Sequence, residues 1–177
     1  MNSRSSLPGV FLLDLKCFED SRGFFIKNFQ KKLLQEKEID FDTWESFYSS
    51  SQKDVIRGMH FQEPPEDHHK VVQCMRGHIT DVLLDLRKGP TYGKYCSFEL
   101  KAKSPQALFI PKGIAHGFVS REDESWMIYF VTSAHDSKCD RGIRWDSFGF
   151  DWKSEKPIIS DRDRAHPALN DYRSNFI

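Results

Sequence analysis

The sequence lacks an excess of charge of either sign. Lysine plus arginine and aspartate plus glutamate both number 26 in its 177 residues, so the formal net charge is zero. Proteins that bind nucleic acid or anionic membranes through broad electrostatic contact carry a marked positive excess. The balance argues against both kinds of partner and leaves room only for a local basic pocket.

Long hydrophobic runs and paired cysteines are absent as well. The apolar run at residues 10–13 is cut by Asp14, so it is too short for a signal peptide or a membrane span. The four cysteines, at positions 17, 74, 96 and 139, contain no C-x-x-C pair, which argues against a zinc knuckle and a disulfide framework. We therefore expect reduced thiols and a cytoplasmic protein.

No repeat, low-complexity linker or change of composition marks a domain boundary. The length suits one domain with a sizeable core, and we expect residues 1–177 to form it. Only 38% of the residues are hydrophobic, but 15 are phenylalanine. The core is therefore expected to be rich in aromatic side chains.

The pattern of short apolar segments predicts a protein made mostly of strands. Segments separated by regular turn signals are typical of a sandwich or a barrel. From residue 55 onward the pattern is that of strands. Strands are expected at residues 9–16, 24–29, 71–75, 79–86, 95–101, 107–111, 117–121 and 126–132. We expect residues 71–75 and 79–86 to form a hairpin around Gly77.

Two short helical segments complete the prediction. Residues 31–38 form the one good helix candidate, with Leu33 and Leu34 able to face inward. Ser160 is expected to cap a helical turn over residues 161–164. After Trp145 the chain is otherwise expected to be irregular.

The segment 79–86 places two carboxylates on an apolar face. Strand alternation puts Asp81 and Asp85 on the same side as Ile79 and Leu83. Burying a carboxylate is costly unless it is paired or lines a polar cavity. We therefore expect cations or a polar cavity next to this face.

The segment 55–70 (VIRGMHFQEPPEDHHK) carries the clearest chemical signal. It places Arg57, His60 and Lys70 around a Pro-Pro turn. A histidine accepts a proton near neutral pH, and lysine and arginine stabilise the resulting anion or hold a phosphate. The trio therefore suits chemistry that makes an anion, whereas a surface loop of solvated charges is the simpler alternative.

The same segment opens a family resemblance that extends along nearly the whole chain. Residues 57–62 (RGMHFQ), Pro64, Pro65 and Lys70 resemble the signature of the dTDP-4-dehydrorhamnose 3,5-epimerases. Agreement continues in order at residues 20–25, 77–87, 90–93, 110–118, 142–145 and 160–163. Many independent blocks in the right order are a far more specific signal than a single short motif.

The resemblance implies an all-β, cupin-like jelly roll (a double-stranded β-helix) with a few short helices, working as a homodimer without a metal or cofactor. Such enzymes isomerise a 4-keto-6-deoxyhexose linked to a nucleotide diphosphate. By position, His60 would be the general base and Asp163 its partner. Lys70, with Asp81 beside it, would stabilise the enolate oxygen, and Tyr129 would return a proton on the opposite face.

The resemblance also implies a set of substrate contacts. Arg57 and His116 would contact the sugar-phosphate, and Arg22 would reach the diphosphate, often from the partner subunit. Phe25 falls where the family packs an aromatic side chain near the nucleotide. The expected substrate-binding residues are Arg22, Phe25, Lys27, Glu45, Phe47, Ser49, Arg57, His116, His135 and Arg162.

Several of these positions depart from the family pattern. Lys27 replaces a usual glutamate that accepts from the thymine N3–H, Glu45 and Phe47 replace Gln and Asn, and His135 replaces a tyrosine. Lysine donates hydrogen bonds and accepts none, so it suits the acceptor N3 of cytosine better than thymine. This motivates the hypothesis that CDP rather than dTDP carries the sugar. Phe47 stands in place of a polar side chain near the sugar. This motivates two further hypotheses: a substrate that lacks another hydroxyl group, or inversion at only one carbon.

Three other functions remain open on the sequence. A 3,4-ketoisomerase would use the same substrate class, and a non-catalytic sugar-nucleotide binding protein would need no intact catalytic set. A metal-dependent cupin oxygenase is suggested by His68 and His69. Their spacing does not match the usual metal pair, and adjacent strand residues point to opposite sides, so we interpret both as loop residues.

Overall fold

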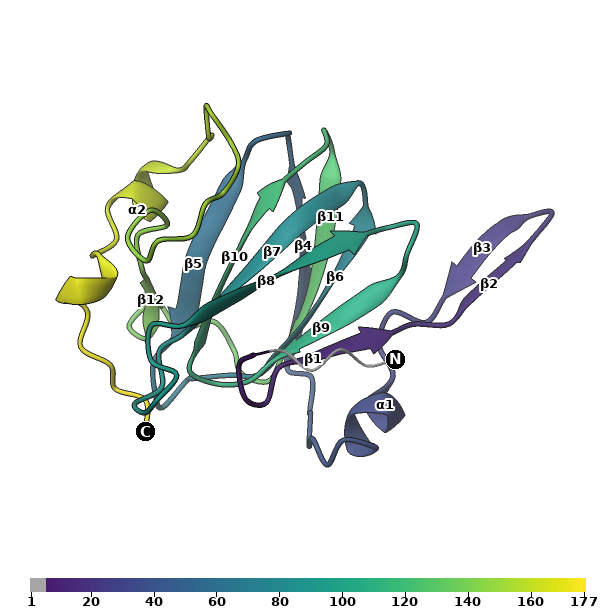
Figure 1. Cartoon of the computed structure of the whole chain (residues 1–177). Coiled ribbons are helices and arrows are strands. Elements are labelled where there is room, and N and C mark those ends of the chain that lie inside the picture. Colours follow the sequence, from purple (N-terminus) through teal and green to yellow (C-terminus); the bar gives the residue numbers. More distant parts are fainter. Residues whose placement is uncertain (1–5) are drawn as a thin grey trace.

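Two five-stranded antiparallel sheets face each other in the computed structural model, which describes residues 6–177 (Figure 1). The first sheet has the order β1-β9-β6-β11-β4 and the second the order β12-β5-β10-β7-β8. The first comprises β1 (Phe11–Asp14), β9 (Gln106–Ile110), β6 (Lys70–Arg76), β11 (Ser125–Val131) and β4 (Glu45–Ser51). The second comprises β12 (Asp140–Gly142), β5 (Ile56–Gln62), β10 (Ile114–Ser120), β7 (His78–Asp85) and β8 (Tyr95–Lys101).

Apolar side chains fill the space between the sheets and cover their outer faces. Val72 of β6 and Leu83 of β7 belong to one cluster that joins the two sheets. The other side of β7 contributes Val82 to a second cluster, which the C-terminal segment covers with side chains such as Phe176. The alternation of strand residues thus fills a core on each side of the second sheet.

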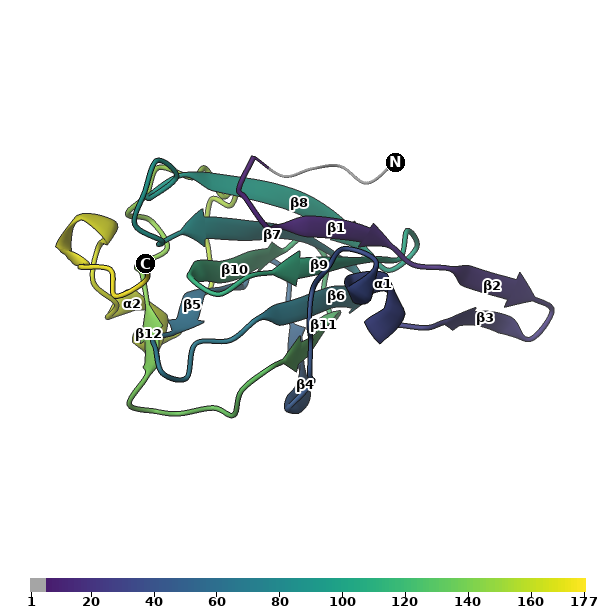
Figure 2. The same cartoon turned by 90° about the horizontal axis from the view of Figure 1, so that it is seen from below.

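A hairpin of two short strands, β2 (Cys17–Asp20) and β3 (Gly23–Ile26), projects away from the sheets (Figures 1 and 2). Its phenylalanines Phe18, Phe24 and Phe25 are 56%, 69% and 58% exposed. Neighbouring large apolar side chains exposed to this degree are unusual on a protein surface and are typical of an interaction site.

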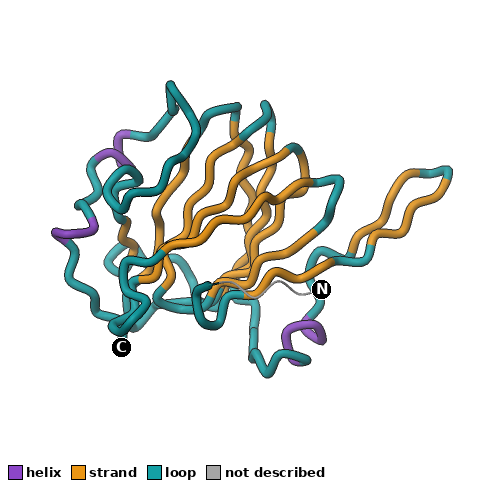
Figure 3. Tube along the Cα trace, in the orientation of Figure 1, coloured by secondary structure: helices purple, strands orange, loops and turns teal. Residues whose placement is uncertain are grey.

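The helices are few and short, as Figure 3 shows. Helix α1 (Lys31–Gln35) is shorter than the predicted 31–38, and it buries Leu34 while Leu33 is half-buried. Helix α2 (Asp161–Arg164) begins at Ser160 as predicted, and a 3₁₀ turn, η1, spans Leu169–Asp171. Within residues 6–177, no helix is long and apolar enough to cross a membrane.

The strand prediction is confirmed in outline, but it misses β2, β4 and β12 and is wrong in one pairing. The predicted hairpin of residues 71–75 and 79–86 does not form, because β6 and β7 lie in different sheets. Gly77, at φ +78, lies at the crossing, where an added Cβ would stand 2.6 Å from Ser125 Oγ. A hairpin and a crossing between sheets would bury the same residues of these two strands. The apolar pattern therefore cannot distinguish the two connections.

Candidate active site

A cavity of about 410 Å³ opens between the inner faces of the two sheets. Strands β4, β5, β6, β10 and β11 all contribute side chains to it. Its lining comprises Glu45, Phe47, Ser49, Arg57, His60, Phe61, Gln62, His68, Lys70, His116, Phe118, Tyr129, Val131, His135, Asp140 and Arg162. Ten of the residues expected at the site from the sequence therefore share one cavity.

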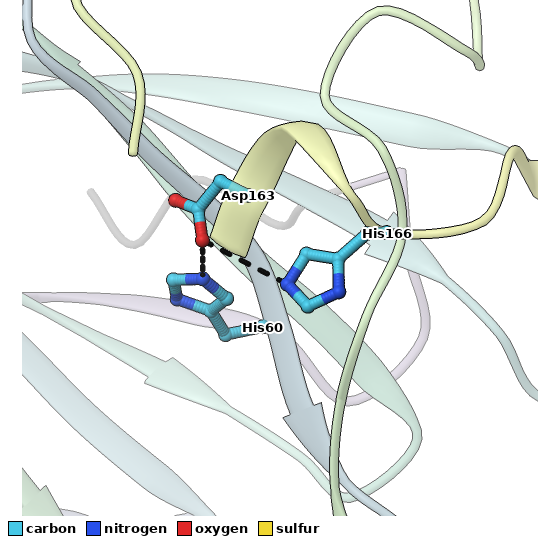
Figure 4. A group of neighbouring side chains, drawn as sticks. All are labelled: His60, Asp163 and His166. Carbon is cyan, nitrogen blue, oxygen red and sulfur yellow. Dashed lines mark hydrogen bonds and ion pairs between the residues drawn. The ribbon is translucent and has the colours of Figure 1, made fainter. Parts of the chain in front are cut away.

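The imidazole of His60 is paired with the carboxylate of Asp163, 103 residues further along the chain (Figure 4). His60 Nε2 lies 2.7 Å from Asp163 Oδ1. An ionised carboxylate only accepts hydrogen bonds, so Nε2 carries the proton and Nδ1 keeps its lone pair. Because the His60 side chain is 31% exposed, this lone pair is available to a substrate as a base.

Local structure holds Asp163 in this position. The Ser160 hydroxyl accepts a hydrogen bond from the Asp163 backbone N–H and so caps α2. The second carboxylate oxygen, Oδ2, accepts from the Gly58 backbone N–H at 3.0 Å. Burial acts to raise the pKa of Asp163, but the hydrogen bond with His60 and the Gly58 N–H outweigh it and lower the pKa below its usual value. The side chain is therefore an anion at neutral pH.

Lys70 approaches the dyad from the opposite sheet. It is the first residue of β6, and its ammonium donates to the backbone carbonyl of His60 at 3.2 Å. Burial lowers the pKa of Lys70 to about 8, although Asp140 and Asp81 act in the other direction. The cation therefore persists at neutral pH with little competing hydration, which suits a group that stabilises a developing oxyanion.

Asp81 pairs with His116 rather than directly with Lys70, which corrects the pair expected from the sequence. His116 Nε2 lies 2.7 Å from Asp81 Oδ2, and both side chains are almost fully buried. The pairing follows from the register, since Phe118, two residues from His116 on the same face, lies opposite Asp81. Burial raises the pKa of Asp81, while the charge and hydrogen bond of His116 oppose the shift.

Asp85, the second carboxylate of this face, is neutralised by a cation as expected. Arg87 Nη2 lies 2.6 Å from the fully buried carboxylate of Asp85. This pair lies outside the cavity lining. Asp85 is therefore structural.

Tyr129 lies in the cavity with its ring against Phe47. The two residues are direct cross-strand neighbours on β11 and β4, and their rings stack at 4.8 Å with an interplanar angle of 15°. Burial raises the pKa of Tyr129, against the smaller opposite effect of the Ser49 hydroxyl. The phenol therefore keeps its proton at neutral pH and is equipped as an acid.

Two arginines that were expected to bind substrate line the cavity and have protein partners of their own. Arg57 donates to Ser51 Oγ and to the Ser50 carbonyl, each at 3.0 Å. Arg162 forms an ion pair of 2.6 Å with Asp140. These contacts fix two guanidinium groups in the cavity lining, where they suit an anionic part of a ligand.

Arg22, Phe25 and Lys27 lie away from this cavity. Arg22 and Phe25 belong to the projecting hairpin and line a separate surface hollow, while Lys27 follows β3 and is exposed. Arg22 forms an ion pair of 2.6 Å with Asp20 of the same hairpin. A single chain therefore does not bring these three residues to the dyad.

Several residues in the cavity lining or beside the dyad were not expected from the sequence. Gln62 and His68 join the wall through a network in which Gln62 Nε2 donates to the backbone carbonyls of Glu66 and Ala134. Burial lowers the pKa of His68 to about 3, so this loop histidine is neutral. Asp140 and the dyad neighbour His166 carried no local sequence signal, because only the fold brings them near His60.

Together these groups provide the parts for removing and returning a carbon-bound proton. His60 is the base, the ammonium of Lys70 lies at the backbone carbonyl of His60, and the protonated phenol of Tyr129 lies on β11. A C–H next to a carbonyl becomes acidic only when the enolate is stabilised as it forms. Proton transfer next to a ketone is therefore the chemistry that the arrangement supports best.

Comparison with known proteins agrees with this chemistry. Residues 4–171 match the family model described as dTDP-4-dehydrorhamnose 3,5-epimerase. The chain belongs to this family. A dTDP-4-dehydrorhamnose 3,5-epimerase of Shigella flexneri is 35% identical over 166 residues, which cover 90% of this chain and 91% of the relative. The protein is accordingly an isomerase of the epimerase type.

Solved structures of the epimerase family share the fold. The crystal structure from Sulfolobus tokodaii has a TM-score of 0.91 at 35% identity and covers 98% of this chain and 97% of its own. A Legionella pneumophila 3,5-epimerase, solved with dTDP-4-keto-L-rhamnose, has a TM-score of 0.91 at 28% identity and covers 96% and 93%. The expected all-β, cupin-like fold is thereby confirmed.

Proposed function

We propose that this cavity epimerises a dTDP-linked 4-keto-6-deoxyhexose at C3 and C5, with His60 as the base. The observation that carries the proposal is the His60–Asp163 dyad, held at 2.7 Å, whose His60 lines one cavity together with Lys70 and Tyr129. Family membership supports the substrate class.

The proposed steps use each group in its preferred protonation state. His60 Nδ1 takes the proton from the carbon next to the ketone, and Asp163 stabilises the imidazolium that forms. The bond electrons move to the C4 oxygen, where Lys70 and its positive charge hold the enolate. Tyr129 then donates its phenolic proton to the opposite face of the carbon, and solvent restores both side chains to their starting states.

The carrier is proposed to be dTDP, because a relative of the same fold was solved with a dTDP-linked keto sugar. The exposed ammonium of Lys27, next to the hairpin, motivates CDP as the second candidate. A binding titration with dTDP and CDP side by side tests the choice. Tighter binding of CDP, lost in Lys27→Glu, would overturn the dTDP assignment.

We further propose that the protein works as a homodimer in which the hairpin of one subunit reaches the cavity of the other. The hairpin projects from its own chain with three exposed phenylalanines. On β4, Tyr48 is 66% exposed, and it stacks on Trp126 of the neighbouring strand. A second copy would cover this apolar surface and deliver Arg22 to the cavity.

Mixing two inactive variants tests this arrangement. Arg22→Ala and His60→Ala each damage one part of a shared site, and a hybrid dimer contains one site with both parts intact. Random mixing of equal amounts should restore about a quarter of the wild-type sites. Restoration to no more than the sum of the two variants would show that each site lies within one chain.

The product itself distinguishes the proposed reaction from its rivals. With dTDP-4-keto-6-deoxyglucose, we expect NMR to show inversion at C3 and C5 with the ketone still at C4. A ketone moved to C3 would identify a 3,4-ketoisomerase. Tight binding without any turnover would identify a sugar-nucleotide binding protein.

A further inference from the structure

A second histidine, His166, lies beside the dyad and points to the same carboxylate oxygen of Asp163 as His60 does (Figure 4). Its Nε2 lies 3.7 Å from Asp163 Oδ1, the atom that pairs with His60. The rings of His60 and His166 are nearly perpendicular, with centroids 5.8 Å apart. Nothing in the proposed reaction uses this residue.

The local structure makes room for His166. Its ring lies over Gly142 of β12, where an added Cβ would stand 2.3 Å from the ring. Gly142 is the direct strand partner of His60. Any other residue at position 142 would therefore push His166 away from the dyad.

His166 Nε2 is a buried polar atom without a hydrogen-bond partner. A buried polar atom without a partner costs free energy, so its presence calls for an explanation. A bound cation on this nitrogen would provide the missing partner.

We propose that His60, Asp163 and His166 form a binding site for a divalent transition-metal ion, with Zn²⁺ as the preferred ion, and that the ion inhibits the epimerase reversibly. One ligand atom from each residue lies within 4.8 Å of the others. Two imidazoles and one carboxylate are a common ligand set for such ions. Magnesium and calcium prefer oxygen ligands and are not expected to bind.

The geometry requires only small side-chain movements. Zinc bonds to nitrogen and oxygen are about 2.0–2.2 Å long, so tetrahedral ligand atoms stand about 3.4 Å apart. His60 Nε2 and Asp163 Oδ1, now 2.7 Å apart, must separate slightly to admit the ion, and His166 must move closer to both. The partly exposed side of His60 leaves a fourth position for water. Three protein ligands and one open position form the usual arrangement of an accessible zinc site.

Inhibition follows from the chemistry of the His60 ring. The ion would take the Nε2 lone pair, so the one proton of the neutral ring would move to Nδ1. Nδ1 then has no lone pair with which to accept the substrate proton. Binding stands on the geometry alone, whereas the inhibition rests on the proposed function of His60.

The test compares the wild type with His166→Gln and with His78→Gln as a matched control. His78 also contacts a carboxylate, Glu99, but lies outside the His60 cluster. Zinc binding is measured by competition with a chromophoric chelator, and the ligand type by the visible spectrum after Co²⁺ is added instead. Turnover is measured as deuterium exchange into the substrate, with zinc and again after a chelator is added.

We expect wild type and His78→Gln to bind one zinc ion and to lose turnover reversibly. His166→Gln should keep its turnover in the presence of chelator and need at least about tenfold more zinc for the same inhibition. Gly142→Ala, which displaces the His166 ring, should weaken zinc binding in the same direction, and thermal unfolding verifies that both variants are folded.

Equal zinc affinity in the wild type and in folded His166→Gln would overturn the site. A cobalt spectrum dominated by thiolate would also overturn it, because it would place the ion at an exposed thiol such as Cys17. Binding that depends on His166 but leaves turnover unchanged would refute inhibition through His60. That result would count against the proposed base and leave the metal site standing.

Discussion

Replacing Asp163 with asparagine removes the charge of the dyad and keeps its shape. The carboxylate accepts from His60 Nε2 at 2.7 Å and from the Gly58 N–H at 3.0 Å. An amide has one oxygen and one NH₂ group, so it satisfies only one of these two donors. If the oxygen stays with Gly58, the NH₂ group faces His60 and favours the tautomer with the proton on Nδ1.

The expected loss is large, because that tautomer cannot accept a proton at Nδ1. A positioned general base contributes about 10²–10⁴ in rate, which corresponds to about 2.7–5.4 kcal/mol of transition-state free energy. We therefore expect the rate of deuterium exchange in Asp163→Asn to fall within this range. The substrate Km should change little, since Asp163 is not part of the cavity lining.

Asp161→Asn is the matched control. Asp161 lies on the same helix and is exposed, so the substitution removes the same charge without touching His60. We expect its exchange rate to stay within about threefold of the wild type, in line with other surface changes. A folded Asp163→Asn variant that also stays within threefold would refute the dyad.

Three further predictions follow from the same geometry. Tyr129→Phe keeps the stacking on Phe47 but loses the acid, so deuterium exchange should continue while formation of inverted product, followed by NMR, falls at least about 100-fold. Burial lowers the pKa of Lys70 to about 8, so its ammonium is lost as the pH rises through this value. Wild-type turnover should therefore fall above pH 8. Lys70→Met should turn over slowly, and its rate should not show this fall above pH 8. Ser160→Ala removes the cap that positions Asp163. It should lower the free energy of unfolding by about 1 kcal/mol in denaturant melts, with a parallel loss of turnover. Unchanged stability and turnover would show that the cap does not position the carboxylate.

The sequence alone predicted the strand-rich class and most central strands, because their apolar residues alternate or run continuously. It missed β4, whose sequence ESFYSSS has few apolar residues. Edge strands bury little, so their patterns are weak. It also misplaced the β6–β7 connection, because whether a chain pairs or crosses at Gly77 depends on contacts with Ser125, far away in sequence.

The site, too, could be predicted only in part from local sequence. Ser160 and its helical turn could be found from local capping rules, whereas the meeting of His60 and Asp163 across 103 residues came from family resemblance. Asp140 and His166 lie near His60 only because β12 and the segment after α2 pack beside β5. No spacing rule in the sequence connects these residues.

The central claim is that the cavity makes an enolate on both sides of the C4 ketone. Incubating the protein in D₂O with dTDP-4-keto-6-deoxyglucose and weighing the sugar by mass spectrometry tests it directly. We expect two deuterons from solvent, one at C3 and one at C5, and none in His60→Ala on the same timescale. An unlabelled sugar after full incubation with folded wild-type protein would contradict the account.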